Sequence, residues 1–332
     1  MMKLLYRLYE LENHIYHYNR RTKACINWFV GNLCASPIGQ GIYSLIKPRM
    51  LSFPKRVQVE TTSYCNAKCE MCPQPIMPRR NRHMDQEVYE KIIKELAKNR
   101  DKLNTLSFHF LNEPLMDPRL FERIKLAKDS GIRQTQLNTN AQLLNEEKAI
   151  KLIESGIDTV TFSLGGLEPE TQDQRRVGTS LSSVEKNIDN FIALINSPAF
   201  LTRKPKVIIY TIKSSSEDKA WKPVVKKYKN QVNAIVVINQ NNWGGRSKNI
   251  EKEQNLTEYR VPCPSIFTTM NINVDGKVNL CCVDWEDREI MGDLREQSVS
   301  EIWNGKMETY RRMHLQNRSE KIPMCKECTI YR

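Results

Sequence analysis

Six short β-rich runs alternate with helical patterns through the middle of this 332-residue chain. Neighbouring parallel strands need a long crossover between them, so this alternation predicts a parallel sheet with right-handed connections. Eight strand–helix units would close a standard barrel. Six units therefore predict an α/β fold, either an open, partial (β/α)6 TIM-like barrel or a doubly wound sheet. The expected strands are residues 56–60, 105–111, 133–138, 158–164, 206–212 and 233–239.

Helix signals between the strands support this organisation. Asp85 and Asp117 are suitable N-caps, and Pro118 suits a first helical position. Ser182 and Glu185 have the spacing of a capping box. The expected helices are residues 85–99, 117–131, 145–155, 182–196 and about 216–228.

The composition is that of an ordinary globular protein, with 40% hydrophobic and 27% charged residues. The net charge is +13, but the basic residues are dispersed and no nucleic-acid-binding motif accompanies them, so we expect no nucleic-acid partner. Ten cysteines occur mainly in clusters, which favours metal ligands in a reducing compartment over disulfides. The amino terminus lacks the pattern of a secretory signal, and we expect a cytoplasmic protein.

Residues 1–54 lie outside the strand–helix repeat. Residues 24–46 carry no charge and are long enough to span a bilayer, but polar residues, glycines and a proline interrupt them. We expect an N-terminal helical extension packed on the rest of the protein, with weak contact to a membrane surface as the alternative. An apolar stripe with helical spacing runs through Leu4, Leu8, Leu11, Ile15 and Tyr18.

Three cysteines, Cys65, Cys69 and Cys72, follow the first expected strand within eight residues. Thiolates select zinc or iron–sulfur clusters. A structural zinc ion needs four ligands, whereas a cubane cluster held by three thiolates leaves one iron free to bind another molecule. The alternative is a zinc ribbon, or a structural cluster that a distant residue completes.

This CxxxCxxC motif, in a loop after the first strand of a βα array, resembles the signature of the radical S-adenosylmethionine (SAM) superfamily. Met71, just before Cys72, occupies the usual apolar position of that motif. The resemblance implies a [4Fe–4S] cluster whose unique iron binds SAM through its amino and carboxylate groups. It also implies reductive cleavage of SAM to a 5'-deoxyadenosyl radical, which abstracts hydrogen from a substrate.

Two segments resemble the parts of that family that bind the amino acid end of SAM. The resemblance assigns Glu113, in "LNEP", to the SAM ammonium group, although Leu111 and Asn112 replace the two glycines of the family's "GGEP". It assigns Asn138 or Asn140, in "LNTNA", to the ribose or the carboxylate.

Two later segments extend the resemblance. Ser163, in "FSLGG", matches a ribose-contacting position. Gly165 stands where the family often has an aspartate, so no catalytic base is assigned there. Arg175 and Arg176 match an arginine-containing segment, and the resemblance implies that one of them pairs with the SAM carboxylate.

The C-terminal flank supplies a second set of thiols. Cys263, Cys281, Cys325 and Cys328 can close a cluster with four ligands, and Gly276 indicates a turn between two strands before Cys281. A zinc ion on four cysteines is the alternative. The pattern resembles the SPASM/twitch auxiliary domain, in which a β-hairpin and a helix hold a [4Fe–4S] cluster. The number of cysteines is typical of the form with one auxiliary cluster.

The other three cysteines receive no ligand role. Cys282 could substitute for Cys281 as a ligand, but a buried thiol is the expected state. Cys25 and Cys34 have no partner in the sequence and are expected to be ordinary buried thiols.

The two resemblances together imply one class of chemistry. We expect an oxidoreductase that acts on a small polar molecule, of the sugar or cyclitol type, with the auxiliary cluster accepting an electron or positioning the substrate. Two [4Fe–4S] clusters, SAM and an external one-electron donor of the flavodoxin or ferredoxin type are implied. The alternatives are a peptide or protein maturase, and a non-catalytic iron–sulfur protein. The expected domains are a helical extension at 1–54, a radical SAM core at 55–245 and an auxiliary domain at 246–332.

Overall fold

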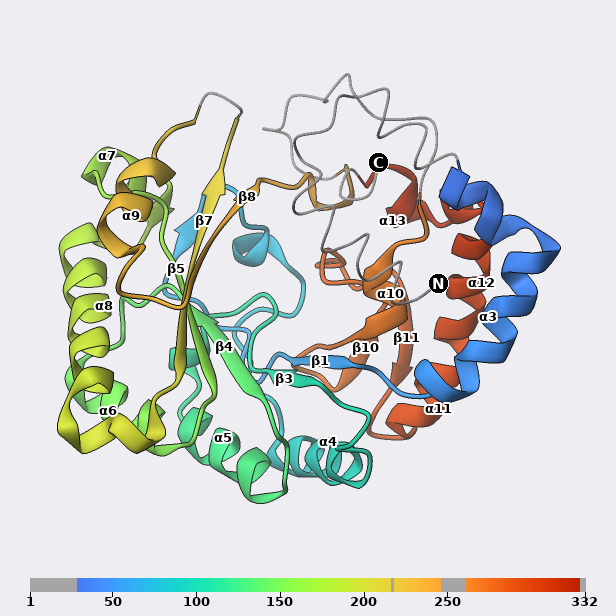
Figure 1. The fold of residues 1–332 in the computed structure, drawn as a ribbon, viewed down its shortest axis with the longest axis horizontal. Coiled ribbons are helices and arrows are strands. Elements are labelled where there is room, and N and C mark those ends of the chain that lie inside the picture. The colour runs from blue at the N-terminus through green and yellow to red at the C-terminus, as the bar shows by residue number, and fades with distance from the viewer. Residues whose placement is uncertain (1–28, 216–217, 246–260, 329–332) are drawn as a thin grey trace.

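A computed structural model describes residues 29–215, 218–245 and 261–328. Within these residues, a nine-stranded sheet has the order β11-β10-β9-β1-β3-β4-β5-β7-β8 (Figure 1). All neighbours from β9 to β8 are parallel, which confirms the predicted α/β partial barrel. The strands of the repeat are β1 (Arg56–Val59), β3 (Thr105–Ser107), β4 (Thr135–Thr139), β5 (Thr159–Ser163), β7 (Lys206–Lys213) and β8 (Ala234–Asn239).

Helices cover the outer face of this sheet (Figure 1). Phe191 of α8 meets Phe162 of β5 edge to face, with 5.4 Å between the ring centroids. Alternate strand residues such as Val57 and Val59 are fully buried in the same core, which leaves the other face of each strand for different side chains. These helices are α4 (Gln86–Lys98), α5 (Leu120–Asp129), α6 (Glu146–Glu154), α8 (Leu181–Asn196) and α9 (Trp221–Tyr228).

Short elements fill several loops. A two-stranded sheet pairs β2 with β6, apart from the main sheet. The short elements before residue 261 are β2 (Lys68–Cys69), β6 (Arg176–Val177), α7 (Pro169–Gln172), η1 (Gln74–Ile76), η2 (Pro114–Met116), η3 (Pro198–Arg203) and η4 (Trp243–Gly245).

The predicted start of the second helix is wrong. α5 begins at Leu120, not directly after Asp117. The Asp117 carboxylate accepts a hydrogen bond from the N–H of Arg119 and forms an ion pair with Arg123 at 2.9 Å. Asp117 therefore lies in the turn before the helix, where its carboxylate is held by the buried side chain of Arg123.

The predicted capping box is also wrong. α8 begins at Leu181, with Ser180 at the N-cap position and Ser182 inside the helix. The N–H of Leu181 donates to the Asp173 carboxylate at 2.6 Å. A side chain from an earlier segment thus caps the helix, and Ser182 is not needed for that role.

The C-terminal region extends the main sheet. β9 (Thr269–Ile272) pairs with β1 in parallel, and β10 (Lys277–Asn279) and β11 (Ile290–Asp293) continue in antiparallel pairs. Gly276 forms the predicted turn between β9 and β10 with a φ of +79°. Backbone hydrogen bonds therefore join this region to the core. Its helices are α10 (Pro264–Thr268), α11 (Val299–Asn304), α12 (Lys306–Leu315), η5 (Ser319–Lys321) and α13 (Pro323–Lys326).

Helix α3 (Pro37–Met50) packs on the C-terminal region (Figure 1). Tyr43 donates a hydrogen bond to Glu308 of α12 at 2.7 Å, and Lys47 pairs with the same carboxylate at 3.3 Å. Helix α3, in the described part of the N-terminal extension, is thus packed on the C-terminal region. The predicted stripe from Leu4 to Tyr18 lies outside the described residues.

Weak membrane contact stays a prediction. Within the described ranges, no helix has the length and apolar character needed to cross a bilayer. Exposed apolar side chains at the start of these ranges are Phe29, Leu33, Ile38 and Leu45. We expect at most weak attachment to anionic liposomes, released by salt because screening weakens the contribution of basic residues. Cosedimentation at low and high salt measures it, and extraction by detergent alone would contradict it.

Candidate active site

The loop after β1 carries the CxxxCxxC motif. Cys69 ends β2 and lies opposite Arg176 of β6. The N–H of Cys72 donates to the carbonyl oxygen of Cys69 at 3.0 Å and turns the chain back. Gly178, after β6, has a φ of +96°, and a Cβ there would lie 2.3 Å from the carbonyl oxygen of Asn66. Close backbone contacts therefore hold this loop, and they require a glycine at position 178.

The cysteines of this loop are partly buried. Burial raises the pKa of Cys65 and of Cys72 to about 12, and the neighbouring Arg176 opposes the rise at Cys72. Buried thiols of high pKa become thiolates when a metal centre supplies positive charge. Three thiols in one loop fit an iron–sulfur cluster with an open coordination position.

Glu113 and Asn140 lie beside this loop. The Glu113 carboxylate accepts hydrogen bonds from Thr139 Oγ1 at 2.7 Å and from the N–H of Asn140 at 2.8 Å. Asn140 Nδ2 donates to Asn66 Oδ1 at 2.9 Å. Burial raises the pKa of Glu113, and the Asn140 and Thr139 donors oppose the rise. Glu113 therefore orders the end of β4, and a contact with the SAM ammonium group stays a prediction.

The two candidate arginines have different surroundings. Arg175 forms an ion pair with Asp218 at 2.7 Å and is partly exposed. Arg176 is buried next to Cys72, and its Nε lacks a hydrogen-bond partner among the described residues. Buried guanidinium nitrogens are normally partnered, so this one fits an anionic ligand. Arg176 is the better candidate of the two for the SAM carboxylate.

Asn138 of β4 and Ser163 at the end of β5 are partly buried on one face of the sheet. Gly165 follows, where the family often has an aspartate. Its N–H donates to Gln172 Oε1 at 2.7 Å, and a Cβ there would lie 3.0 Å from that oxygen and 3.3 Å from Arg176 Nε. Gln172 therefore fills the space that a larger side chain at position 165 would need.

Four cysteines line one pocket in the C-terminal region, namely Cys263, Cys281, Cys325 and Cys328. Cys282 is not among the lining residues. In the described part of the chain, no three His, Cys, Asp or Glu side chains converge on a single metal ion. The ligands of a cluster lie further apart, because each binds a different iron. A pocket lined by four thiols fits the cluster with four ligands that the sequence predicts.

His314 is a neighbour of this pocket that sequence reasoning missed. Its Nδ1 accepts a hydrogen bond from the N–H of Cys263 at 3.3 Å, and its Nε2 lies 3.6 Å from Cys325 Sγ. A neutral ring with Nδ1 as acceptor carries its proton on Nε2, directed at the sulfur. Hydrogen bonds to ligand sulfurs tune cluster potentials. A single histidine in an amphipathic helix carries no motif that could reveal this role.

Trp243 holds the other end of the cysteine motif. Its Nε1 donates to the carbonyl oxygen of Met71 at 2.6 Å. Trp243 follows β8, so the end of the repeat is joined to the loop after its first strand. The predicted place of Met71 beside SAM stays a prediction.

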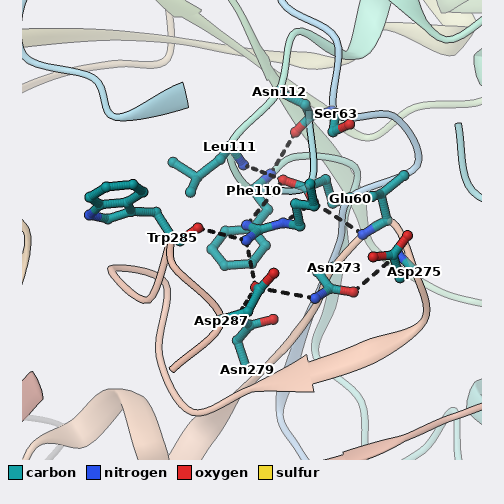
Figure 2. A network of polar contacts seen from close by, with 12 residues as sticks. Glu60, Ser63, Phe110, Leu111, Asn112, Asn273, Asp275, Asn279, Trp285 and Asp287 are labelled. Carbon is teal, nitrogen blue, oxygen red and sulfur yellow. Dashed lines mark hydrogen bonds and ion pairs between the residues drawn. The ribbon is translucent and has the colours of Figure 1, made fainter. Parts of the chain in front are cut away.

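A buried ion network joins the cysteine loop to the C-terminal region (Figure 2). Arg79 pairs with Glu60 at 2.7 Å and with Asp287 at 2.6 Å, and the Arg79 and Glu60 side chains are 1% and 0% exposed. The N–H groups of Leu111 and Val274 donate to the Glu60 carboxylate at 3.2 and 3.1 Å. Burial alone would lower the pKa of Arg79, but Glu60 and Asp287 raise it, so the guanidinium stays charged.

Further contacts complete this network. The Arg79 guanidinium lies 5.0 Å from the centroid of the Phe110 ring and donates to the carbonyl oxygen of Trp285 at 3.0 Å. Figure 2 shows the Trp285 ring directed away from the network while its carbonyl oxygen faces it. Arg79 is 208 residues from Asp287, so no local motif could reveal the network.

Comparison with known proteins supports a radical SAM enzyme with a SPASM domain. The family model of the radical SAM superfamily matches residues 59–203, and that of the SPASM iron–sulfur cluster-binding domain matches residues 263–329. The S-adenosyl-L-methionine-dependent 2-deoxy-scyllo-inosamine dehydrogenase of Niallia circulans is 24% identical over 82% of this chain and 91% of the relative. PqqA peptide cyclase of Bradyrhizobium diazoefficiens is 31% identical over only 36% of this chain and 31% of its own length.

A solved structure shares the fold. The crystal structure of BtrN in complex with AdoMet and 2-DOIA matches 82% of this chain and 92% of that one, with a TM-score of 0.59 and 20% identity. The chain belongs to the radical SAM superfamily and carries a C-terminal SPASM iron–sulfur domain. It is an enzyme, and its cofactors are SAM and [4Fe–4S] clusters.

The ion network yields a stability prediction. Arg79→Met should lower the free energy of unfolding by about 3–5 kcal/mol, because it leaves the Glu60 carboxylate buried without a cation. Adding Glu60→Gln should recover part of the loss. The urea midpoint, followed by circular dichroism, measures both effects.

The matched control is Arg133→Met. Arg133 pairs with Asp101 at 2.7 Å, but both side chains are exposed, so the expected loss is at most about 1 kcal/mol. Equal losses in Arg79→Met and Arg133→Met would contradict the role given to the network.

The two thiol sites yield a prediction of cofactor content. Anaerobically reconstituted protein should hold two [4Fe–4S] clusters, about eight iron atoms per chain. Replacing Cys65, Cys69 and Cys72 together by Ala should leave one cluster. Iron, sulfide and zinc analysis measures the content, and zinc in place of iron and sulfide would show the ligand assignment to be wrong.

Proposed function

We propose that the enzyme oxidises a secondary alcohol of a small, polyhydroxylated ring of the aminocyclitol or sugar type. The observation that carries this proposal is the extent of one likeness. The 2-deoxy-scyllo-inosamine dehydrogenase aligns with 82% of this chain over 91% of its own length. A likeness along nearly a whole relative supports a shared reaction type better than a likeness confined to the core.

The chemistry requires both thiol sites. When bound, SAM and the clusters supply a 5'-deoxyadenosyl radical and an acceptor for one electron. To become a ketone, the substrate would lose a hydrogen atom from its carbinol carbon, a proton from its hydroxyl group and one electron. The bound SAM would supply the acceptor of the hydrogen atom, solvent would take the proton, and the auxiliary cluster held by the second set of cysteines would supply the acceptor of the electron. An external one-electron donor of the flavodoxin or ferredoxin type must reduce the first cluster. The cysteines that would hold the clusters must stay reduced, and this requirement supports a cytoplasmic location.

The residues of this chain divide these tasks. Cys65, Cys69 and Cys72 would hold the cluster that binds SAM, and Arg176 would pair with the SAM carboxylate. The other candidate contacts to SAM are Met71, Glu113, Asn138, Asn140 and Ser163, whereas the pairing of Arg175 with Asp218 makes it a weaker candidate. The auxiliary cluster would be held by Cys263, Cys281, Cys325 and Cys328.

A peptide maturase is the second candidate. The observation in its favour is the likeness to PqqA peptide cyclase, which covers 31% of that relative. A match of that extent supports shared SAM chemistry but not a shared substrate. The non-catalytic alternative is set aside, because the family and its named relatives are enzymes.

The substrate prediction is tested with 2-deoxy-scyllo-inosamine. Reconstituted enzyme with SAM and a chemical or protein reductant should produce 5'-deoxyadenosine and a ketone in equal amounts, because each oxidation uses one radical. Liquid chromatography with mass spectrometry measures both products. Formation of 5'-deoxyadenosine without ketone, for this and other cyclitols and sugars, would exclude the proposed substrate class.

The auxiliary thiols yield a separate prediction. Replacing Cys325 and Cys328 by Ala should spare reductive cleavage of SAM in folded protein while product formation is lost. Circular dichroism and a melting curve must accompany the assay, since loss of a cluster can unfold a small domain. A well-folded variant that forms product at the normal rate would show that the auxiliary cluster is only structural.

A further inference from the structure

The inner face of the sheet carries a row of polar side chains. Asn271 of β9, Gln58 of β1, Ser107 of β3 and Gln136 of β4 are partners in register, so their side chains lie on the same face. The alternate positions, such as Val57, belong to the apolar core on the other face. The row therefore lies on the face that the outer helices do not cover.

Two side chains of this row, Gln136 and Ser107, are hydrogen-bonded to each other, whereas Asn271 and Gln58 have polar atoms without a hydrogen-bond partner in the described residues. Gln136 Nε2 donates to Ser107 Oγ at 2.7 Å. Asn271 is 0% exposed, yet neither atom of its amide finds a hydrogen-bond partner in the described residues. Gln58 Oε1 and His109 Nδ1 are also buried without a partner there, while Gln58 Nε2 lies 3.4 Å from His109 Nε2. Buried polar atoms are nearly always partnered, so this group points to a polar ligand.

The unpartnered atoms lie on or just after strands that lead toward the two thiol sites. Open α/β sheets bind ligands beyond the carboxyl ends of their strands. Gln58 is near the end of β1, which leads into the cysteine loop. On the other side, Asn279 of β10 pairs with Asn271 in register and precedes Cys281 by two residues. Strands that lead to both thiol sites therefore border these atoms.

The chemistry of the group favours hydroxyls. Burial lowers the pKa of His109 to about 4, so the ring is neutral near pH 7. The nearby Glu60 is already paired with Arg79. An amide offers both donors and acceptors, and a neutral imidazole offers one of each. A hydroxyl can donate and accept, so several hydroxyls of one ring could satisfy these atoms, whereas a charged group would find no counter-ion.

We propose that Gln58, His109 and Asn271 bind hydroxyl groups of the substrate and select the hydroxyl-bearing face of a polyhydroxylated ring. This inference rests on the proposed function and names the residues that would recognise its substrate class. It explains why a stable fold keeps unpartnered polar atoms in its interior, since such violations concentrate at functional sites.

Two variants remove the polar atoms at nearly constant volume. Asn271→Leu should leave Tm equal or raise it, because neither atom of its amide has a hydrogen-bond partner in the described residues. Gln58→Met should change Tm little, because it removes the unpartnered Oε1 together with one long contact, from Nε2 to His109 Nε2 at 3.4 Å. Cleavage of SAM without substrate should stay unchanged. The KM for 2-deoxy-scyllo-inosamine should rise by about tenfold or more, since each variant removes hydrogen bonds to the ring.

Asn233→Leu is the control for an amide with a hydrogen-bond partner in the fold. Its Oδ1 accepts a hydrogen bond from the N–H of Val207 at 2.8 Å, at the opposite end of the strands. Loss of this paired amide should lower Tm and leave the KM unchanged. The comparison separates amides that stabilise the fold from amides kept for a ligand.

Direct binding separates this inference from the proposed function. Calorimetry under argon should measure the binding of myo-inositol, 2-deoxy-scyllo-inosamine and a short neutral peptide to the SAM-loaded wild type and variants. Cyclitol binding that both variants lose supports the inference, and if no ketone forms then only the proposed function fails. The inference is overturned if neither cyclitol binds the wild type, if only the peptide binds, or if the variants lower Tm like Asn233→Leu and keep their affinity.

Discussion

The contacts of Arg79 with Glu60 and Asp287 join the segments that carry the two thiol sites. Glu60 follows the first strand of the core, Arg79 follows the cysteine loop, and Asp287 belongs to the C-terminal region. A buried charge without its partner is costly, so these three segments can shift only together. The parallel pairing of β9 with β1 also joins the C-terminal region to the core. The strand before the cysteine loop and the strands of the C-terminal region therefore belong to one continuous sheet, and the two parts are not joined only by a flexible linker. Electron transfer from a substrate to the auxiliary cluster would depend on the spacing that this sheet sets.

The repeating part of the fold was predictable because each of its elements is encoded locally. Strand and helix periods can be read within short windows, and Asp85 caps α4 as predicted. The pairing of β9 with β1 joins segments more than two hundred residues apart, and its apolar alternation is common to many strands. The sequence pattern mispredicts the starts of α5 and α8, because Asp117 pairs with Arg123 six residues later and Asp173 caps Leu181 eight residues later, and neither spacing is that of a local cap motif.

The cysteines of the site were predictable from the sequence, but the side chains that surround them were not. Cysteine spacing is visible in sequence because several ligands must share one loop, as Cys65 and Cys72 do. The choice between Arg175 and Arg176 depends on which side chain is buried, and that follows from the pairing of β6 with β2. Gln58 and Asn271 are ordinary strand residues until their register brings them together. Their lack of partners can be read only from packed side chains.

The account depends on removal of hydrogen from a carbinol carbon, and isotope transfer tests this step most directly. 2-Deoxy-scyllo-inosamine deuterated at its carbinol carbons would be incubated anaerobically with reconstituted enzyme, SAM and a reductant. The account predicts 5'-deoxyadenosine that carries one deuterium, together with the ketone. Unlabelled 5'-deoxyadenosine formed alongside unchanged cyclitol, with transfer of deuterium instead from a labelled peptide, would contradict it.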